Sequence, residues 1–180
     1  MSTDNQTFAF QTYCHSKQES NSPFIPQIIE LSYKLHSMSS LEISSLTIAH
    51  SYGKRLLITA MNADMKQLHR KDFVEIIDVD PVKHTIFYFG PTHPPIITPF
   101  LWMLHYAKRE IQCSIYFTST SKENIIESFP HIKSEGAFLT ILKNMLKTLQ
   151  HSPGIRYNDN VVLITAKSFD EMEQIIKKEE

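Results

Sequence analysis

The stretch RLLITAMNADMKQLHRKDFVEII, residues 55–77, sets the fold expected for this chain. It begins with an apolar run at residues 56–58, continues through a polar segment, and becomes apolar again from Phe73 to Ile77. Short apolar runs that are bounded by polar segments are typical of buried β-strands. The stretch therefore predicts two strands of a sheet, joined by a polar loop.

The pattern on both sides of this stretch adds further strands and several helices. Apolar and β-branched runs predict strands, and apolar residues three or four apart predict helices. The strands are expected at 43–49, 56–60, 73–77, 83–89, 111–118 and 161–165, and the helices at 26–36, 99–109, 120–126, 138–149 and from 168 onward. Because hairpin-connected strands alternate with helices, the order predicts an α/β (α+β type) fold with a mainly antiparallel central sheet in three αβα layers.

The composition indicates one ordinary globular domain behind a polar N-terminal segment. Residues 1–22 are expected to form a flexible arm or a loosely docked extension, because they are rich in Ser, Thr, Asn and Gln. Residues 23–180 are expected to form a single domain, and a chain of this length buries roughly 70% of its unfolded surface.

Charge and cysteine content exclude several classes of protein. The net charge of −1 argues against binding to nucleic acid or to an anionic membrane, which requires a basic excess. No apolar stretch approaches the ~20 residues of a membrane span, and no secretory signal is recognisable. With only Cys14 and Cys113, a disulfide framework is not expected. We therefore expect a reducing compartment, the cytoplasm. The four glycines do not form a Gly-rich nucleotide loop.

From about Gln27 to Lys177, the order and spacing of these elements resemble the class II aldolase/adducin domain family. The resemblance rests on the 55–77 stretch, the helix that opens at Pro99, the strand at 113–118, and the ending NVVLITAKSFDEMEQIIKK (160–178). It implies the same three-layer fold. It also implies a homo-oligomer, often a cyclic tetramer in this family, with the site between subunits.

The chain departs from the family pattern where the family holds its metal and its substrate. Family enzymes bind a metal through three histidines, two of them in a His-x-His pair, and this chain has nine histidines but no such pair. Tyr116 and Thr118 stand in the register of that pair, Ile97 in that of the catalytic carboxylate, and Asp159 or Asn160 in that of the third histidine. Met61 and Asn62 stand where the family has its phosphate loop. Ser44 and Ser45 stand where the family has a Gly-Asn. Isoleucine cannot transfer a proton, and tyrosine and threonine are poor zinc ligands.

These departures predict a catalytically degenerate class II aldolase-like protein, a pseudoenzyme without catalytic residues, metal site or cofactor. It is expected to act as a binding, regulatory or assembly module, with a second copy, another protein or a small ligand as its partner. The alternative is a divergent metal-dependent sugar-phosphate aldolase or epimerase, with zinc in a site rebuilt around His93 and Asp159. A third hypothesis is a small-ligand pocket lined by Ile97, Tyr116 and Met61.

Two further groups of residues are expected to be structural. His105, on the predicted 99–109 helix, is expected to be a partly buried, hydrogen-bonded histidine. Phe87, Tyr88 and Phe89 are expected in the core or at a subunit interface, because no basic stripe accompanies them as it would in a base-stacking platform.

Overall fold

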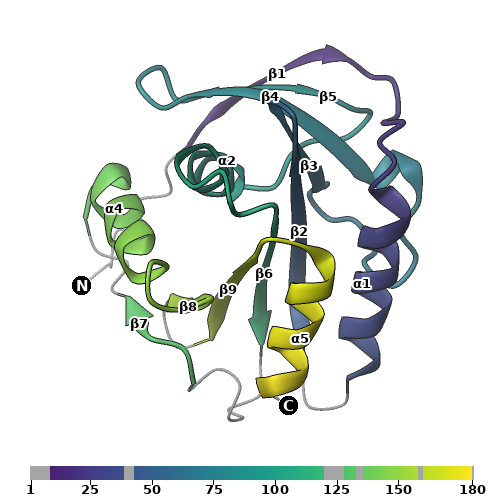
Figure 1. Cartoon of the computed structure of the whole chain (residues 1–180). Helices are drawn as coiled ribbons and strands as arrows, with labels where there is room; N and C mark the ends of the chain where they lie inside the picture. Colours follow the sequence, from purple (N-terminus) through teal and green to yellow (C-terminus); the bar gives the residue numbers. More distant parts are fainter. Residues whose placement is uncertain (1–8, 39–42, 120–127, 133–135, 158–159, 180) are drawn as a thin grey trace, which may run out of the picture.

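A nine-stranded sheet runs through the centre of the described residues, in the order β1-β5-β4-β3-β2-β6-β9-β8-β7 (Figure 1). The computed structural model describes residues 9–38, 43–119, 128–132, 136–157 and 160–179. Neighbouring strands are antiparallel except for two parallel pairs, β1–β5 and β7–β8, so the predicted mainly antiparallel sheet is confirmed. The strands are β1 (Gln11–Ser16), β2 (Ile43–Tyr52), β3 (Arg55–Thr59), β4 (Phe73–Asp80), β5 (Thr85–Phe89), β6 (Cys113–Ser119), β7 (His131–Ile132), β8 (Gly154–Tyr157) and β9 (Val161–Ala166).

Helices cover both faces of the sheet, which confirms the predicted three layers (Figure 1). Helices α1 (Ile25–Ser37) and α5 (Phe169–Glu179) lie on one face, and α2 (Thr98–Ala107) and α4 (Phe138–Thr148) on the other. The sheet therefore has a separate apolar core on each side. The largest fully buried side chains of the two cores include Phe73, Phe117, Ile48, Leu101 and Leu104. None of the helices in the described part of the chain is both long enough and apolar enough to span a bilayer.

Local signals account for where the helices start. Pro26 occupies the first turn of α1, where its missing N–H costs nothing. Ahead of α5, Ser168 Oγ accepts a hydrogen bond from Glu171 N–H at 3.1 Å, and Glu171 Oε2 accepts one from Lys167 N–H at 2.5 Å. The sequence Ser168-Phe-Asp-Glu171 predicts this cap, and the structure confirms it. At α2 the sequence Thr98-Pro99 predicts Thr98 as the capping residue, but the capping residue is Ile97, and the Thr98 hydroxyl donates to Pro95 O at 2.6 Å.

Three strands were not predicted, and one of them lies in the N-terminal segment expected to be a flexible arm or a loosely docked extension. Residues 11–16 form β1, which pairs with β5 through its backbone while nearly all of its side chains stay exposed. The short strands β7 and β8 were also not predicted, nor was a 3₁₀ turn at residues 70–72. The short helix expected at 120–126 lies outside the described residues.

The buried carboxylate of Glu75 anchors the segment between β1 and α1 to the sheet. Glu75 on β4 is only 6% exposed, and its two carboxylate oxygens accept hydrogen bonds from Ser20 Oγ at 2.5 Å and from an Arg55 guanidinium N–H at 2.7 Å. Although burial raises the pKa of Glu75, hydrogen bonds from Ser20, Tyr52 and Arg55 together lower it below its ordinary value. Glu75 thus stays ionised and fixes the connecting segment over the sheet.

Candidate functional site

The strand β6 presents the two residues in the His-x-His register on one face of the sheet. Tyr116 and Thr118 are half-buried on the side covered by α2 and α4, whereas Phe117 between them is 1% exposed in the opposite core. This follows from the alternation of side chains along a strand. The predicted register therefore brings Tyr116 and Thr118 to the same side of the sheet.

Two serines of β2 meet Thr118 and form with it what we call the hydroxyl cluster (Ser44, Ser45 and Thr118). Ser45 lies opposite Thr118 in the antiparallel pairing of β2 and β6. The Thr118 Oγ1 atom forms hydrogen bonds with Ser44 Oγ and with Ser45 Oγ, each at 2.7 Å. These three side chains are neutral, and their hydroxyls already bond one another.

Tyr116 is a neutral phenol at the edge of the core. Burial, with a smaller effect from Tyr157, raises the pKa of Tyr116 to about 12. The two tyrosines come from different strands, β6 and β8, and both pack against the core cluster beneath α2 and α4. Tyr157 was not among the predicted site residues, because strand β8 was not predicted. At neutral pH, Tyr116 offers a hydroxyl and not a phenolate.

The loop in the phosphate-loop register is held by backbone bonds. Thr59 is fully buried, and its Oγ1 accepts a hydrogen bond from Ile48 N–H at 3.1 Å, so its hydroxyl is used inside the sheet. Met61 is 42% exposed, and its N–H donates to His93 O at 2.9 Å. Asn62 is exposed and adopts a left-handed backbone conformation with φ 62°. The loop therefore joins the segment that leads into α2.

Among the other predicted site positions that the structure describes, His93 alone carries a group that zinc prefers as a ligand. Ile97 is an apolar residue at the start of α2, packed against the same core cluster as Tyr116. Asn160 is exposed, and its carbonyl accepts a hydrogen bond from Ser119 N–H at 2.9 Å. Asp159 lies outside the described residues. The exposed His93 has its Nδ1 3.3 Å from the Tyr88 hydroxyl.

The metal that the family resemblance implies does not fit the donor groups in this register. Zinc sites use imidazole, thiolate or carboxylate ligands, and the described side chains here are hydroxyls, a phenol with a raised pKa and an isoleucine. Throughout the part of the chain that the structure describes, no three His, Cys, Asp or Glu residues are grouped to hold a metal.

Two buried histidines lie on either side of the sheet. His105 is 6% exposed, with its Nδ1 3.1 Å from Ile111 O and its Nε2 2.9 Å from Ser114 Oγ, which confirms the predicted hydrogen-bonded histidine. His50 is 4% exposed and stacks between Phe24 and Phe169, at ring-centroid distances of 4.2 and 4.8 Å. Burial lowers the pKa of each histidine to about 4. Both are therefore neutral parts of the core at physiological pH.

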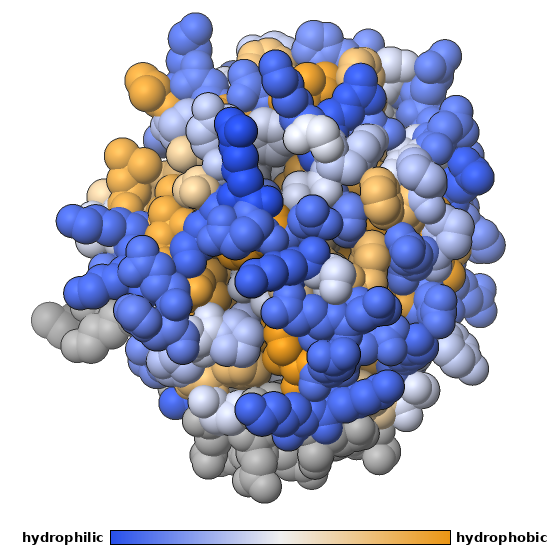
Figure 2. All heavy atoms as spheres, viewed as in Figure 1, coloured by the Kyte–Doolittle hydropathy of each residue, from blue (hydrophilic) through white to orange (hydrophobic). Residues whose placement is uncertain are grey.

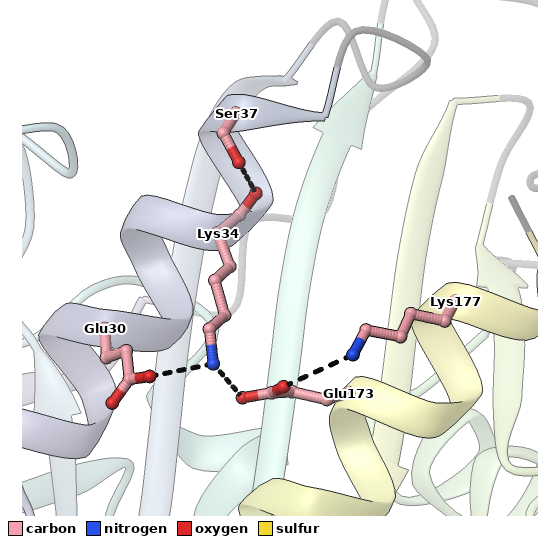
Figure 3. A network of polar contacts seen from close by, with 5 residues as sticks. All are labelled: Glu30, Lys34, Ser37, Glu173 and Lys177. Carbon is pink, nitrogen blue, oxygen red and sulfur yellow. Dashed lines mark hydrogen bonds and ion pairs between the residues drawn. The ribbon is translucent and has the colours of Figure 1, made fainter.

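A groove of about 430 Å³ lies between α1 and α5, away from the hydroxyl cluster. Lys34 crosses it and binds Glu30 Oε1 at 2.8 Å and Glu173 Oε1 at 2.6 Å (Figure 3). The hydrogen bonds that Lys34 donates to Glu173 and Glu30 raise its pKa to about 12. In the orientation of Figure 1, hydrophilic side chains cover most of the visible surface of the molecule (Figure 2). The charged residues of the groove's lining are joined in one network, because Glu173 also pairs with Lys177 at 3.9 Å (Figure 3).

Comparisons with known proteins identify the fold. No family model matches the sequence, and no curated protein matches it. Among solved structures, an L-fuculose 1-phosphate aldolase is 12% identical with a TM-score of 0.63, covering 89% of this chain and 86% of its own. YgbL, a putative aldolase/epimerase/decarboxylase from Klebsiella pneumoniae, is 10% identical with a TM-score of 0.64, covering 85% and 83%.

A third solved structure bears the class name. The N-terminal class II aldolase domain of a conserved protein from Thermoplasma acidophilum is 11% identical with a TM-score of 0.59, covering 88% of this chain and 91% of its own. At these identities, the likeness establishes the fold. The chain therefore has the class II aldolase fold that its sequence predicts.

Proposed function

We propose that this chain is a catalytically degenerate protein on the class II aldolase fold, and that it works as a binding, regulatory or assembly module. The observation that carries the proposal is that Tyr116 and Thr118 stand in the register of the metal-binding pair, with the Thr118 hydroxyl bonded to Ser44 and Ser45 in the hydroxyl cluster. Three neutral hydroxyls that bond one another do not hold a divalent ion as imidazoles do.

The surrounding residues support the same proposal. Ile97, in the register of the catalytic carboxylate, has no group that could take up or release a proton. The Tyr116 hydroxyl, with its pKa raised to about 12, is not a base at neutral pH. Cleavage of a carbon–carbon bond next to a carbonyl needs both a base and a stabiliser for the negative charge that develops. That Ile97 and Tyr116 are not bases at neutral pH supports the proposal.

The chemistry of the site suits an uncharged, hydroxyl-bearing ligand better than a phosphorylated one. Ser44, Ser45 and Thr118 can each donate and accept a hydrogen bond, and the Tyr116 ring provides an apolar wall beside them. The Thr59 hydroxyl, at the start of the loop in the phosphate-loop register, is fully buried and therefore not accessible to an anion. A homo-oligomer in the cytoplasm is part of this proposal.

A retro-aldol assay tests the catalytic part of the proposal. The protein is incubated with L-fuculose 1-phosphate and related sugar phosphates in the presence of zinc, manganese or cobalt, beside an L-fuculose 1-phosphate aldolase as positive control. We expect no cleavage above the buffer rate. Cleavage that disappears in Tyr116→Phe would contradict the proposal, because it would place a reacting group at this site.

A thermal-shift comparison tests the ligand class. A ligand that binds only the folded state raises the Tm. We expect neutral sugars and polyols to raise the Tm more than their phosphates do, and Thr118→Val, which removes one hydroxyl while keeping the shape, to abolish that rise. A larger rise with the phosphates, unaffected by Thr118→Val, would contradict the ligand assignment.

A further inference from the structure

The edge strand β1 leaves one side of the sheet open within the described part of the chain. Gln11 N–H donates to His84 O at 2.8 Å, toward β5. Because successive backbone groups of a strand point to opposite sides, the N–H and C=O groups of Thr12 and Cys14 point away from β5. Natural edge strands are commonly protected by charged residues or proline. The strand QTYCHS has no Lys, Arg, Asp, Glu or Pro, so its open side is not protected in this way.

A ladder of aromatic rings runs across the sheet and reaches this edge. Tyr13 stacks on Phe87 at 5.7 Å, and His15 lies 5.9 Å from both Phe87 and Phe89, while the Arg55 guanidinium lies 5.2 Å from the Phe89 ring centre. Tyr13 forms the outer end of the ladder and is 53% exposed. The edge therefore combines open backbone groups with an exposed ring, the two features that another strand can cover.

We propose that β1 pairs with β1 of a second copy of this chain, antiparallel, about a two-fold axis at Tyr13. In this register Thr12 of one copy lies opposite Cys14 of the other, so the outward backbone groups of both residues are satisfied. Tyr13 then faces Tyr13 of the second copy at a non-hydrogen-bonded position, where side chains approach most closely. The aromatic ladder becomes continuous between the two copies.

The strand's own composition favours a second copy as the occupant. A two-fold contact uses the same patch on both chains, so it must be complementary to itself. A strand without Lys, Arg, Asp or Glu brings no like charges together when it pairs with itself, and the Tyr13 ring meets a ring of its own kind. The irregular register of β1 falls between Cys14 and Ser16, outside the three residues that pair. The inference does not depend on the chemistry of the hydroxyl cluster.

Sedimentation of the full chain under reducing conditions tests the interface. We expect the wild type and Tyr13→Phe to form a dimer. Tyr13→Lys places two ammonium groups opposite each other and should weaken dimerisation by about tenfold or more. Tyr33→Lys is the matched control, because Tyr33 is 71% exposed on helix α1 and undergoes the same substitution on a face of the sheet instead of at the β1 edge. It should dimerise like the wild type.

Disulfide trapping tests the register. In Thr12→Cys, the new thiol should lie opposite the natural Cys14 of the second copy, at a Cα separation of about 5.5 Å that suits a disulfide. Diamide, which accepts the two electrons and two protons of the thiols, should then give a covalent dimer. The Thr12→Cys/Cys14→Ser variant should not cross-link, and the buried Cys113 does not compete. A monomeric wild type, a dimer that Tyr13→Lys leaves intact, or no cross-link in Thr12→Cys would each overturn the proposal.

Discussion

Replacing His50 by phenylalanine should make the protein more stable at pH 7 and less sensitive to acid. The His50 ring is stacked between Phe24 and Phe169, and its buried Nδ1 has no hydrogen-bond partner within the described residues. Phenylalanine keeps the stacked ring and removes the unpartnered nitrogen. Because a buried polar atom without a partner costs about 1–3 kcal/mol, we expect a gain of about 1 kcal/mol in the free energy of unfolding.

The acid sensitivity follows from the pKa values of the two buried histidines. Burial lowers the pKa of His50 and of His105 to about 4, compared with about 6.5 in an unfolded chain. Above pH 6.5 the two histidines are mostly neutral in both the folded and the unfolded chain. Between pH 6.5 and 4 the unfolded chain binds protons that the folded chain does not. Stability therefore falls as the pH falls through this window. From pH 7 to pH 5, each histidine should cost about 2 kcal/mol, a large part of a typical total of 5–15 kcal/mol.

Urea unfolding at pH 7, 6 and 5 measures these effects. The wild type should lose about 4 kcal/mol over this range from the two histidines, and His50→Phe should lose about 2 kcal/mol. His105→Phe is the contrasting variant: it should lower stability at pH 7 by about 1–3 kcal/mol, because Ile111 O and Ser114 Oγ lose their partner. A His50→Phe variant that is less stable than the wild type at pH 7, or that keeps the full pH dependence, would refute the reasoning.

Two further substitutions test the packing of the sheet. Glu75→Ala leaves Ser20 and the half-exposed Arg55 without their acceptor and should destabilise the fold by about 1–2 kcal/mol in urea unfolding, and a loss below about 0.5 kcal/mol would contradict a structural function for this carboxylate. Gly90→Ala places a Cβ 2.7 Å from Val74 Cγ1 at φ +143° and should cost about 2 kcal/mol or more. Its control, Gly53→Ala, meets no atom within 4 Å at φ +58° and should cost only about 1 kcal/mol, so equal thermal shifts for the two would argue against the close packing at Gly90.

Elements with apolar side chains on a buried face were predictable from the sequence, and elements held mainly by backbone bonds were not. All six residues of β9 (Val161–Ala166) are buried, and α4 buries Phe138, Ile141, Leu142 and Met145, so both have clear patterns. In contrast, β1 (Gln11–Ser16) exposes nearly all its side chains and belongs to the sheet mainly through its backbone. Its polar composition is typical of a flexible extension, and no residue in it indicates the pairing with β5.

The candidate site was predictable in register but not in its contacts. Tyr116 and Thr118 follow from the position of β6, and the pairing of β2 with β6 then brings Ser44 and Ser45 to Thr118. The stacking of His50 could not be predicted, because its two aromatic partners come from the starts of α1 and α5, which are distant in sequence. Such contacts depend on tertiary packing and leave no local pattern.

The metal content of the protein, purified without chelator and measured by mass spectrometry, tests the central claim most directly. Dialysis against zinc followed by removal of the excess, with an L-fuculose 1-phosphate aldolase treated in parallel, extends the measurement to metal lost during purification. Since the register of the metal-binding pair holds neutral hydroxyls, we expect far less than one zinc per chain, and the same result for Thr118→Val. One tightly held zinc per chain that is lost when Tyr116 or Thr118 is replaced would contradict the account.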